Sequence, residues 1–313
     1  MRLNYIYRKT PAIAKYLQSL EVARRVIEAM PILPAVVENL RRKSLLKSSL
    51  FSARIEGNRL TMEDIKLMAM GRTTKQVAKI EIFNILTALR LIHSGKLPRK
   101  LNGATMLKLH RLVMAGIADT AGRWRSEPGA IFNQAGVAVY LAPPPNEIPP
   151  LIDQLVKWGN TNAEPALIKA AWCHLAFEKI HPLEDGNGRV GRLVATLILK
   201  NSGFGFGGLV SLEEYLDQHR QIYYDLLAAP SKDITGFIEF FLEALNFQAD
   251  KAIGQLRNSG EESGADSLLP RRAEILATIK DHRLVSFDFM RRRFYQMAVS
   301  TLHYDLQQLI KAG

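Results

Sequence analysis

The sequence contains a single cysteine, Cys173, among 313 residues. One cysteine cannot form an intramolecular disulfide or build a cysteine-based zinc cluster, and its rarity is typical of proteins in a reducing compartment. No stretch reaches about 18 uninterrupted apolar residues, and the first residues lack the apolar segment of a secretory signal. We therefore expect a soluble, cytoplasmic protein that has no membrane partner.

Alternation of apolar and polar residues, the pattern of β-strands, is almost absent, and there are no internal repeats. Apolar residues recur instead at intervals of three and four, which predicts helices. The expected helical ranges are 17–30, 34–55, 62–70, 76–94, 104–117, 148–158, 165–180, 189–201, 212–228 and 233–257. The exception is a pair of short β-prone pieces, 130–132 and 137–141, joined by a glycine-containing turn. The fold class that follows is all-α with one small hairpin.

Acidic residues are in the minority: 30 Asp and Glu stand against 42 Lys and Arg, a formal net charge of +12. Such an excess favours an anionic partner. Residues 1–100 carry 20 basic and 7 acidic residues, and residues 268–313 carry 8 and 4, whereas 101–267 carry 14 and 19. Basic runs such as 41–43 fit either a polyanion-binding face or a solvated helix surface, and we expect the solvated surface.

The segment 258–267 is polar, rich in Gly and Ser and without periodicity, which predicts a linker. Three helix-sized patterns follow, at 271–281, 286–294 and 298–312. They resemble a winged helix-turn-helix domain whose last helix exposes Ser300, Thr301, His303 and Tyr304. The sequence ends at Gly313, where the wing would begin, so we expect either that the chain is truncated or that the wing is absent. DNA binding through 268–313 is one use of such a domain, and dimerisation or target docking is another.

The most informative stretch runs from His181 to Arg192 and reads His-Pro-Leu-Glu-Asp-Gly-Asn-Gly-Arg-Val-Gly-Arg. An apolar helix delivers His181 to its end, Pro182 breaks the pattern, and a Gly-Asn-Gly turn opens into the next helix. Glycines at a helix N-terminus let backbone N–H groups converge on an anion, which the helix dipole also favours. The stretch therefore predicts an anion site.

Charged and titratable side chains accompany this turn. Arg189 and Arg192 lie three residues apart on the first helical turn, so both can face the same phosphates. Asp185 offers a hard oxygen ligand suited to a phosphate-bound magnesium ion, and His181 is a base within reach. A capped turn with solvated arginines explains any one of these residues but not the set.

The stretch resembles the signature of the Fic family, His-Pro-Phe-x-Asp/Glu-Gly-Asn-Gly-Arg-x-x-Arg, with Leu183 as the apolar anchor in place of Phe. The resemblance extends over residues 35–250 and implies a helical Fic-type core that transfers AMP from ATP to a Ser, Thr or Tyr hydroxyl of a target protein. It implies that His181 deprotonates the hydroxyl and that Asp185 holds Mg²⁺. The phosphate-binding residues that it implies are Gly186, Asn187, Gly188, Arg189 and Arg192.

Upstream, the segment 52–58 matches the inhibitory motif of the same family. Apolar residues in 45–55 make one helical face, and Gly57-Asn58 is a C-cap signal, so Glu56 falls at a helix C-terminus. The dipole disfavours a carboxylate there unless a partner offsets it. The resemblance implies that the partner is Arg192, that the ion pair obstructs the ATP γ-phosphate site in cis, and that Ser52, Glu56 and Asn58 are the inhibitory residues.

Several signals outside the two motifs bear on the site. The hairpin resembles the Fic flap, with Ala130, Ile131 and Phe132 docking the target, although its sequence departs from the usual flap. Tyr223 and Tyr224 match a pair that borders the adenine in relatives, and core packing is the competing interpretation for one of them. The G-x-G-x-x-G pattern at 203–208 follows a helix rather than a strand, so it indicates a loop. We expect His174 to be structural, because no further metal ligands gather near it.

We therefore divide the sequence into an N-terminal helical region, 1–100, with its inhibitory helix at 44–58, a Fic catalytic core, 101–257, the linker, and a C-terminal domain, 268–313. The expected partners are a target protein and a second copy of the chain, through auto-AMPylation or a homodimer. Two alternatives stay open: a DNA-binding transcriptional regulator with a nucleotide-sensing Fic core, and a Fic enzyme that uses a different nucleotide donor. Intact His181 and Asp185 favour an enzyme.

Overall fold

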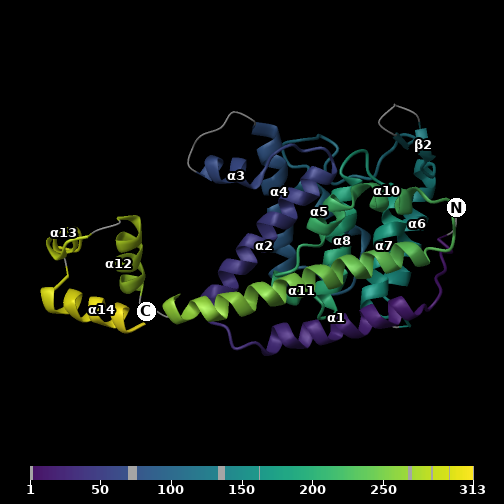
Figure 1. The fold of residues 1–313 in the computed structure, drawn as a ribbon. Coiled ribbons are helices and arrows are strands. Elements are labelled where there is room, and N and C mark those ends of the chain that lie inside the picture. The colour runs from purple at the N-terminus through teal and green to yellow at the C-terminus, as the bar shows by residue number, and fades with distance from the viewer. Residues whose placement is uncertain are drawn as a thin grey trace. The chain divides into compact units, whose positions relative to one another are not determined.

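Most of the described residues lie in helices, as the apolar periodicity predicts (Figure 1). The computed structural model describes residues 3–69, 76–132, 138–161, 163–266, 270–282, 285–295 and 297–312. Its helices are α1 (Pro11–Ala29), α2 (Pro34–Ile55), α3 (Met62–Ala69), α4 (Gln76–His93), α5 (Gly103–Val113), α6 (Ile148–Gly159), α7 (Ala166–Ile180), α8 (Asn187–Asn201), α9 (Leu212–Gln218), α10 (Arg220–Ala228), α11 (Thr235–Asp266), α12 (Pro270–Asp281), α13 (Phe287–Arg293) and α14 (Val299–Ala312). The chain divides into two compact units, Met1–Ile253 and Gly254–Gly313.

Helix α7 forms the centre of the first unit, because it is largely apolar and almost all of its residues are buried. All of its residues from Leu167 to Ile180 except Lys169 are buried. A helix without a polar face has to be surrounded by other elements. Helices α6, α8 and α10 pack against α7, while α2 packs against α4 and α9. The end of α7 and the start of α8 are thereby held in rigid surroundings.

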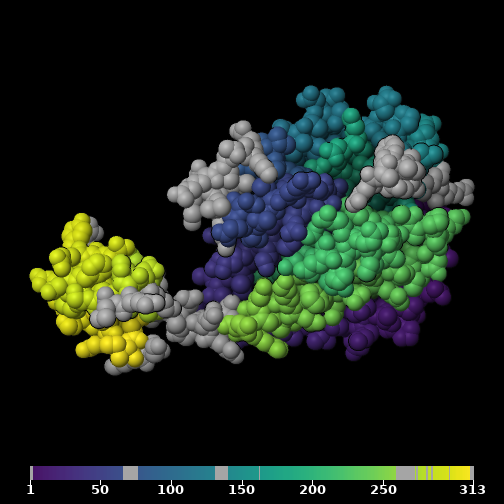
Figure 2. Space-filling model, turned by 45° about the horizontal axis from the view of Figure 1, so that its top comes forward, coloured from purple at the N-terminus to yellow at the C-terminus, as the bar shows by residue number. Residues whose placement is uncertain are grey.

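The N-terminal hundred residues belong to the same core as the later helices. Leu45 and Leu50 of α2 and Ile82 and Leu89 of α4 are buried in one cluster with α7 and α8. In Figure 2 the purple and blue N-terminal residues lie directly against the green later helices. The expected regions 1–100 and 101–257 therefore belong, as far as Ile253, to one compact unit.

The predicted hairpin is present as strands β1 (Ala130–Phe132) and β2 (Ala138–Leu141), which pair antiparallel. Ala130 lies opposite Leu141 and Ile131 opposite Tyr140, and the register is irregular between Ile131 and Phe132. The predicted turn residues, 133–136, and residue 137 of the second predicted β-prone piece lie outside the described residues. The hydroxyl of Tyr140 donates to Lys179 O at 2.7 Å, which ties β2 to the end of α7.

The expectation of a non-helical linker at 258–267 is wrong for the residues described there. Helix α11 continues without a break to Asp266, and the boundary between the two units falls earlier, after Ile253. Glycine in a helix costs about 1 kcal/mol, but extending an existing helix adds a hydrogen bond for each residue ordered. The buried first half of α11 supplies that existing helix.

The second unit holds the three predicted helices, α12, α13 and α14, around a small core of Ile275, Met290, Leu302 and Leu309. Ser300, His303 and Tyr304 are exposed on α14, and Thr301 is half-buried. No strand occurs in the described part of this unit, so its assignment as a winged helix-turn-helix and its binding of DNA stay predictions. None of the described helices, in either unit, combines the length and apolarity needed to cross a membrane.

Candidate active site

His181 stands at the turn that follows α7, in a conformation that needs support. Its φ of 48° and ψ of 56° lie in the left-handed region, where residues other than glycine are strained. The buried Arg125 supplies that support: its Nε donates to His181 O at 2.8 Å and its backbone N donates to Pro182 O at 2.9 Å. Its remaining nitrogens donate to Glu127 O and Pro143 O, on either side of the hairpin. Nothing in the sequence pattern pointed to Arg125.

The imidazole of His181 is electrostatically suited to accept a proton. Burial lowers the pKa of His181 below its ordinary value, and the nearby positive charge of Arg125 lowers it further. The ring is therefore neutral near pH 7, which is the form that a general base needs.

The turn between α7 and α8 is braced from within by Asn187. Its amide accepts from Leu183 N and donates to Leu183 O, both at 2.9 Å. Gly186 has φ 82°, and a side chain at this position would press against Met114 Sδ. Leu183 is fully buried, as expected for an apolar anchor. The side chain of Asn187 thus shapes the loop, and only its backbone is left to meet an anion.

A carboxylate already occupies the N-terminus of α8. A methyl group added to Gly188 would overlap Glu56 Oε1, so the Glu56 side chain lies against the backbone where an anion is expected. Arg192 Nη2 donates to the same oxygen at 2.9 Å, and Arg192 also binds the hydroxyl and carbonyl oxygens of Ser52. The ion pair between Glu56 and Arg192 that the family resemblance implies is present.

The surroundings of Arg192 make Glu56 its main source of negative charge. Arg192 is 1 % exposed, and although burial acts to lower its pKa, the charge of Glu56 raises it. Burial raises the pKa of Glu178, beneath Arg192, to about 8, so that carboxyl group is largely protonated at neutral pH.

His174, on α7, is neutral, because burial lowers its pKa to about 3. Its Nε2 lies 2.8 Å from the hydroxyl of Tyr223, a structural role as expected.

Arg189 does not join Arg192 as a phosphate-facing pair in this structure. Its Nη1 donates to Glu81 Oε1 at 2.6 Å and its Nη2 donates to Asp185 Oδ1 at 2.7 Å. Its side chain is 6 % exposed and turned toward α4. The sequence did not identify Glu81 as a site residue, because an acidic residue on an amphipathic helix is ordinarily solvated.

Asp185 is the exposed carboxylate of the turn, at 61 % side-chain exposure. Its Oδ1 accepts from Arg189 and from Gly186 N, while Oδ2 accepts no hydrogen bond from the described residues. Within the described ranges no group of three His, Cys, Asp or Glu side chains is arranged to hold a metal ion. One carboxylate with a free oxygen fits Mg²⁺, which is commonly held by one or two carboxylates together with substrate phosphates.

The tyrosine pair separates into two roles. Tyr223 is 1 % exposed and packs in the core beside His174. Tyr224 is 40 % exposed, and its hydroxyl donates to Ile55 O, at the end of α2, at 2.8 Å. Core packing is therefore the correct interpretation for Tyr223, and Tyr224 is the one left to border a ligand.

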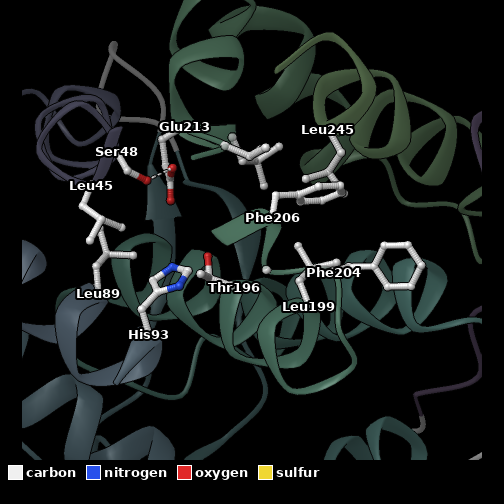
Figure 3. A pocket seen from close by; sticks show the side chains of 13 residues that line it. Leu45, Ser48, Leu89, His93, Thr196, Leu199, Phe204, Phe206, Glu213 and Leu245 are labelled. Carbon is white, nitrogen blue, oxygen red and sulfur yellow. Dashed lines mark hydrogen bonds between the residues drawn. The ribbon is translucent and has the colours of Figure 1, made fainter. Parts of the chain in front are cut away.

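Helix α2 is also anchored away from its C-terminus. The hydroxyl of Ser48 donates to the buried carboxylate of Glu213 beside a cavity of about 30 Å³ (Figure 3). His93 and Thr196 line the same cavity together with apolar side chains such as Leu45. Burial raises the pKa of Glu213 above its ordinary value, and the hydrogen bond from Ser48 acts in the opposite direction.

Residues 100–199 match the model of the Fic/DOC family, and this segment includes both strands of the hairpin, the His181 turn and all but the last two residues of α8. The chain is 25 % identical over 236 residues to "Protein adenylyltransferase Fic" of Drosophila persimilis and 24 % identical over 242 residues to that of Culex quinquefasciatus. These alignments cover 72 % and 73 % of this chain but 44 % and 46 % of the relatives. The chain thus spans about half the length of the curated relatives it matches.

Solved structures share the fold. A Fic family protein from Desulfovibrio desulfuricans G20 is 29 % identical, with a TM-score of 0.69 over 79 % of this chain and 76 % of that chain. A Fic domain containing signaling protein from Bacteroides thetaiotaomicron is 22 % identical, with a TM-score of 0.63 over 79 % of this chain and 97 % of that chain.

Proposed function

This chain is a Fic family protein, and we propose that it is a protein adenylyltransferase, autoinhibited in cis, that transfers AMP from ATP to a Ser, Thr or Tyr hydroxyl of a target protein. The observation that carries the proposal is one short turn that joins a neutral base to an anion-accepting helix terminus. His181 ends α7, and the backbone N–H groups that open α8 follow within the same motif. Such a pairing suits attack of a hydroxyl on a phosphate.

The transfer assigns a task to each group. His181 takes the proton of the target hydroxyl while the hydroxyl oxygen forms a bond to the α-phosphorus of ATP. The bond between the α-phosphorus and the oxygen that bridges to the β-phosphate breaks, and pyrophosphate is released. The N-terminus of α8 stabilises the phosphate oxygens through its N–H groups and dipole. A Mg²⁺ ion held by Asp185 supplies neutralisation of phosphate charge when it is bound. The hairpin edge pairs with an extended segment of the target, which places the hydroxyl.

The proposed inhibition follows from what lies on α8. The Glu56 carboxylate takes the place of an anion against Gly188 and neutralises Arg192. A triphosphate that uses the same backbone and the same guanidinium has to displace that carboxylate. Like charges repel, so Glu56 opposes the nucleotide both by filling space and by its charge.

Incubation of the purified chain with labelled ATP and Mg²⁺ tests the proposal. We expect weak labelling of the wild type, strong labelling of Glu56→Gly and none of Glu56→Gly carrying His181→Ala. Glu56→Gln keeps the shape of the side chain and removes its charge, so it should give an intermediate level. Equal labelling of all four proteins would contradict the proposal. Competition between ATP and other nucleotides for thermal stabilisation identifies the donor, because a ligand that binds the folded state raises its stability.

A further inference from the structure

Glu81, on α4, makes two contacts that link separate parts of the site. Its Oε1 accepts from Arg189 Nη1 at 2.6 Å, and its Oε2 accepts from Asn58 Nδ2 at 2.7 Å. Its side chain is 14 % exposed. Asn58 is itself held, because its Nδ2 also donates to Ala78 O and its Oδ1 accepts from Leu60 N. Glu81 is therefore fixed on one side by the turn after α2 and on the other by α8.

Arg189 connects Glu81 to Asp185, the exposed carboxylate of the motif. With Nη1 bound to Glu81, Arg189 Nη2 donates to Asp185 Oδ1 at 2.7 Å. Asp185 is 61 % exposed and lies on a turn, and its Oδ1 also accepts from Gly186 N, so these two contacts together hold its side chain in one orientation. Both contacts engage Oδ1 and leave Oδ2 as the ligand oxygen for a cation.

The charges of Glu81, Arg189 and Asp185 also indicate that Glu81 supports Asp185. Arg189 is almost fully buried, so its charge needs a close counterion. Glu81 is the less exposed of its two carboxylate partners and hence the less screened by water. Because Glu81 balances most of the Arg189 charge, Asp185 keeps a negative charge for a metal ion. If Glu81 were absent, Arg189 would be paired with Asp185 alone and would compete with the metal for it.

We propose that Glu81 is a positioning residue for Asp185, acting through Arg189, and that it sets the affinity of the nucleotide-bound divalent cation. The inference rests on the proposed function, because it takes Asp185 as the metal ligand. It assigns Asn58 a second task beside its place in the inhibitory motif, which is to hold Glu81 against Arg189.

The test measures metal binding directly. In the Glu56→Gly protein, Mn²⁺ is titrated in the presence of α,β-methylene-ATP, and free Mn²⁺ is followed by electron paramagnetic resonance. Glutamine at position 81 has one acceptor oxygen and no charge, so it cannot serve both Arg189 and Asn58. We expect Glu81→Gln to raise the Mn²⁺ Kd about tenfold or more, as is typical when a partner of a metal ligand is lost. Binding of the nucleotide without metal should change by less than about twofold.

Glu21→Gln, which breaks a carboxylate's contacts with Arg24 and Arg25 on α1, is the matched control and should leave the Mn²⁺ Kd unchanged. Thermal unfolding without ligand checks that each variant folds. Where Glu81→Gln does not fold, Glu81→Asp carries the test, with a smaller weakening of Mn²⁺ binding in the same direction.

Two results would overturn the inference alone: an unchanged Mn²⁺ Kd in a folded Glu81 variant, or an equal loss of metal-free nucleotide binding. A Glu56→Gly parent that binds no Mn²⁺ and nucleotide and transfers no AMP would overturn the proposed function as well.

Discussion

The carboxylate of Glu56 lies so close to Gly188 that a methyl group at that glycine would overlap Glu56 Oε1. Glu56 ends the second helix of the chain, and Gly188 opens the helix that carries Arg192. An acidic side chain thus sits at a helix N-terminus, where an anion is favoured by the dipole and by free N–H groups. This contact explains how a carboxylate at the unfavourable end of α2 is stabilised.

Gly188→Ala tests this contact. In the wild type the added methyl group collides with Glu56, and we expect the free energy of unfolding to fall by about 1–3 kcal/mol, as for other overpacked sites. In the Glu56→Gly background the collision is absent, so the loss should be smaller. Urea unfolding of the four proteins gives the coupling energy between the two positions. Losses of the same size in both backgrounds would contradict the contact.

Arg125→Ala should uncouple His181 from the hairpin. Arg125 holds the strained turn of His181 and both ends of the hairpin, so its loss misplaces the base and the target together. In the Glu56→Gly protein we expect kcat for AMP transfer to fall about 100-fold, a typical result of a displacement near 1 Å. Thermal stabilisation by ATP should persist. Arg123→Ala, at an exposed neighbour, is the control and should leave kcat unchanged.

Glu178 should make the free energy of unfolding depend on pH up to about pH 8. Burial raises the pKa of Glu178 to about 8, above its ordinary value of 4.5, so the folded state holds a proton that the unfolded state releases. Stability from this group is present at low pH and declines as pH rises toward 8. His174, with its pKa lowered to about 3, is neutral in both states above pH 7 and does not interfere.

We expect the free energy of unfolding to decrease between pH 6.5 and 8, by up to about 1.4 kcal/mol for each pH unit, and to level off once the pH exceeds the pKa of Glu178. Glu178→Gln removes the titrating group and should flatten that part of the profile. Urea unfolding at several pH values measures both proteins. Parallel profiles for the wild type and the variant would show that Glu178 is not protonated in the folded state.

Ser48→Ala should loosen α2 from the rest of the first unit. The substitution removes a hydrogen bond from the buried Glu213 carboxyl group, which typically costs about 1–3 kcal/mol. Ser49→Ala is the matched control, because the Ser49 hydroxyl binds only Leu46 O within its own helix. Chemical denaturation compares the two variants. The hydrogen bond to Glu213 contributes nothing if both variants lose the same small amount.

Local patterns predicted most of the secondary structure and the catalytic turn. The ten helical ranges of the first unit correspond to observed helices, apart from shifted ends and the division of 212–228 into α9 and α10. The prediction of a non-helical linker at 258–267 was wrong for the residues described there, because extension of α11 outweighed the local Gly- and Ser-rich composition. Arg189 was predicted to face phosphates beside Arg192, but its side chain turns to Glu81. Spacing places two residues on one helical turn and leaves their rotamers open.

The sequence by itself determined which residues form helices and that His181, a glycine turn and α8 follow one another, because periodicity, helix stops and turn chemistry act over a few residues. Only the tertiary structure decided which side chains meet. Arg192 and Glu56 are 136 positions apart, and Arg189 and Glu81 are 108 apart. Such pairs depend on how α2 and α4 pack against α8, and burial then makes each pairing matter, since a buried charge requires a close counterion.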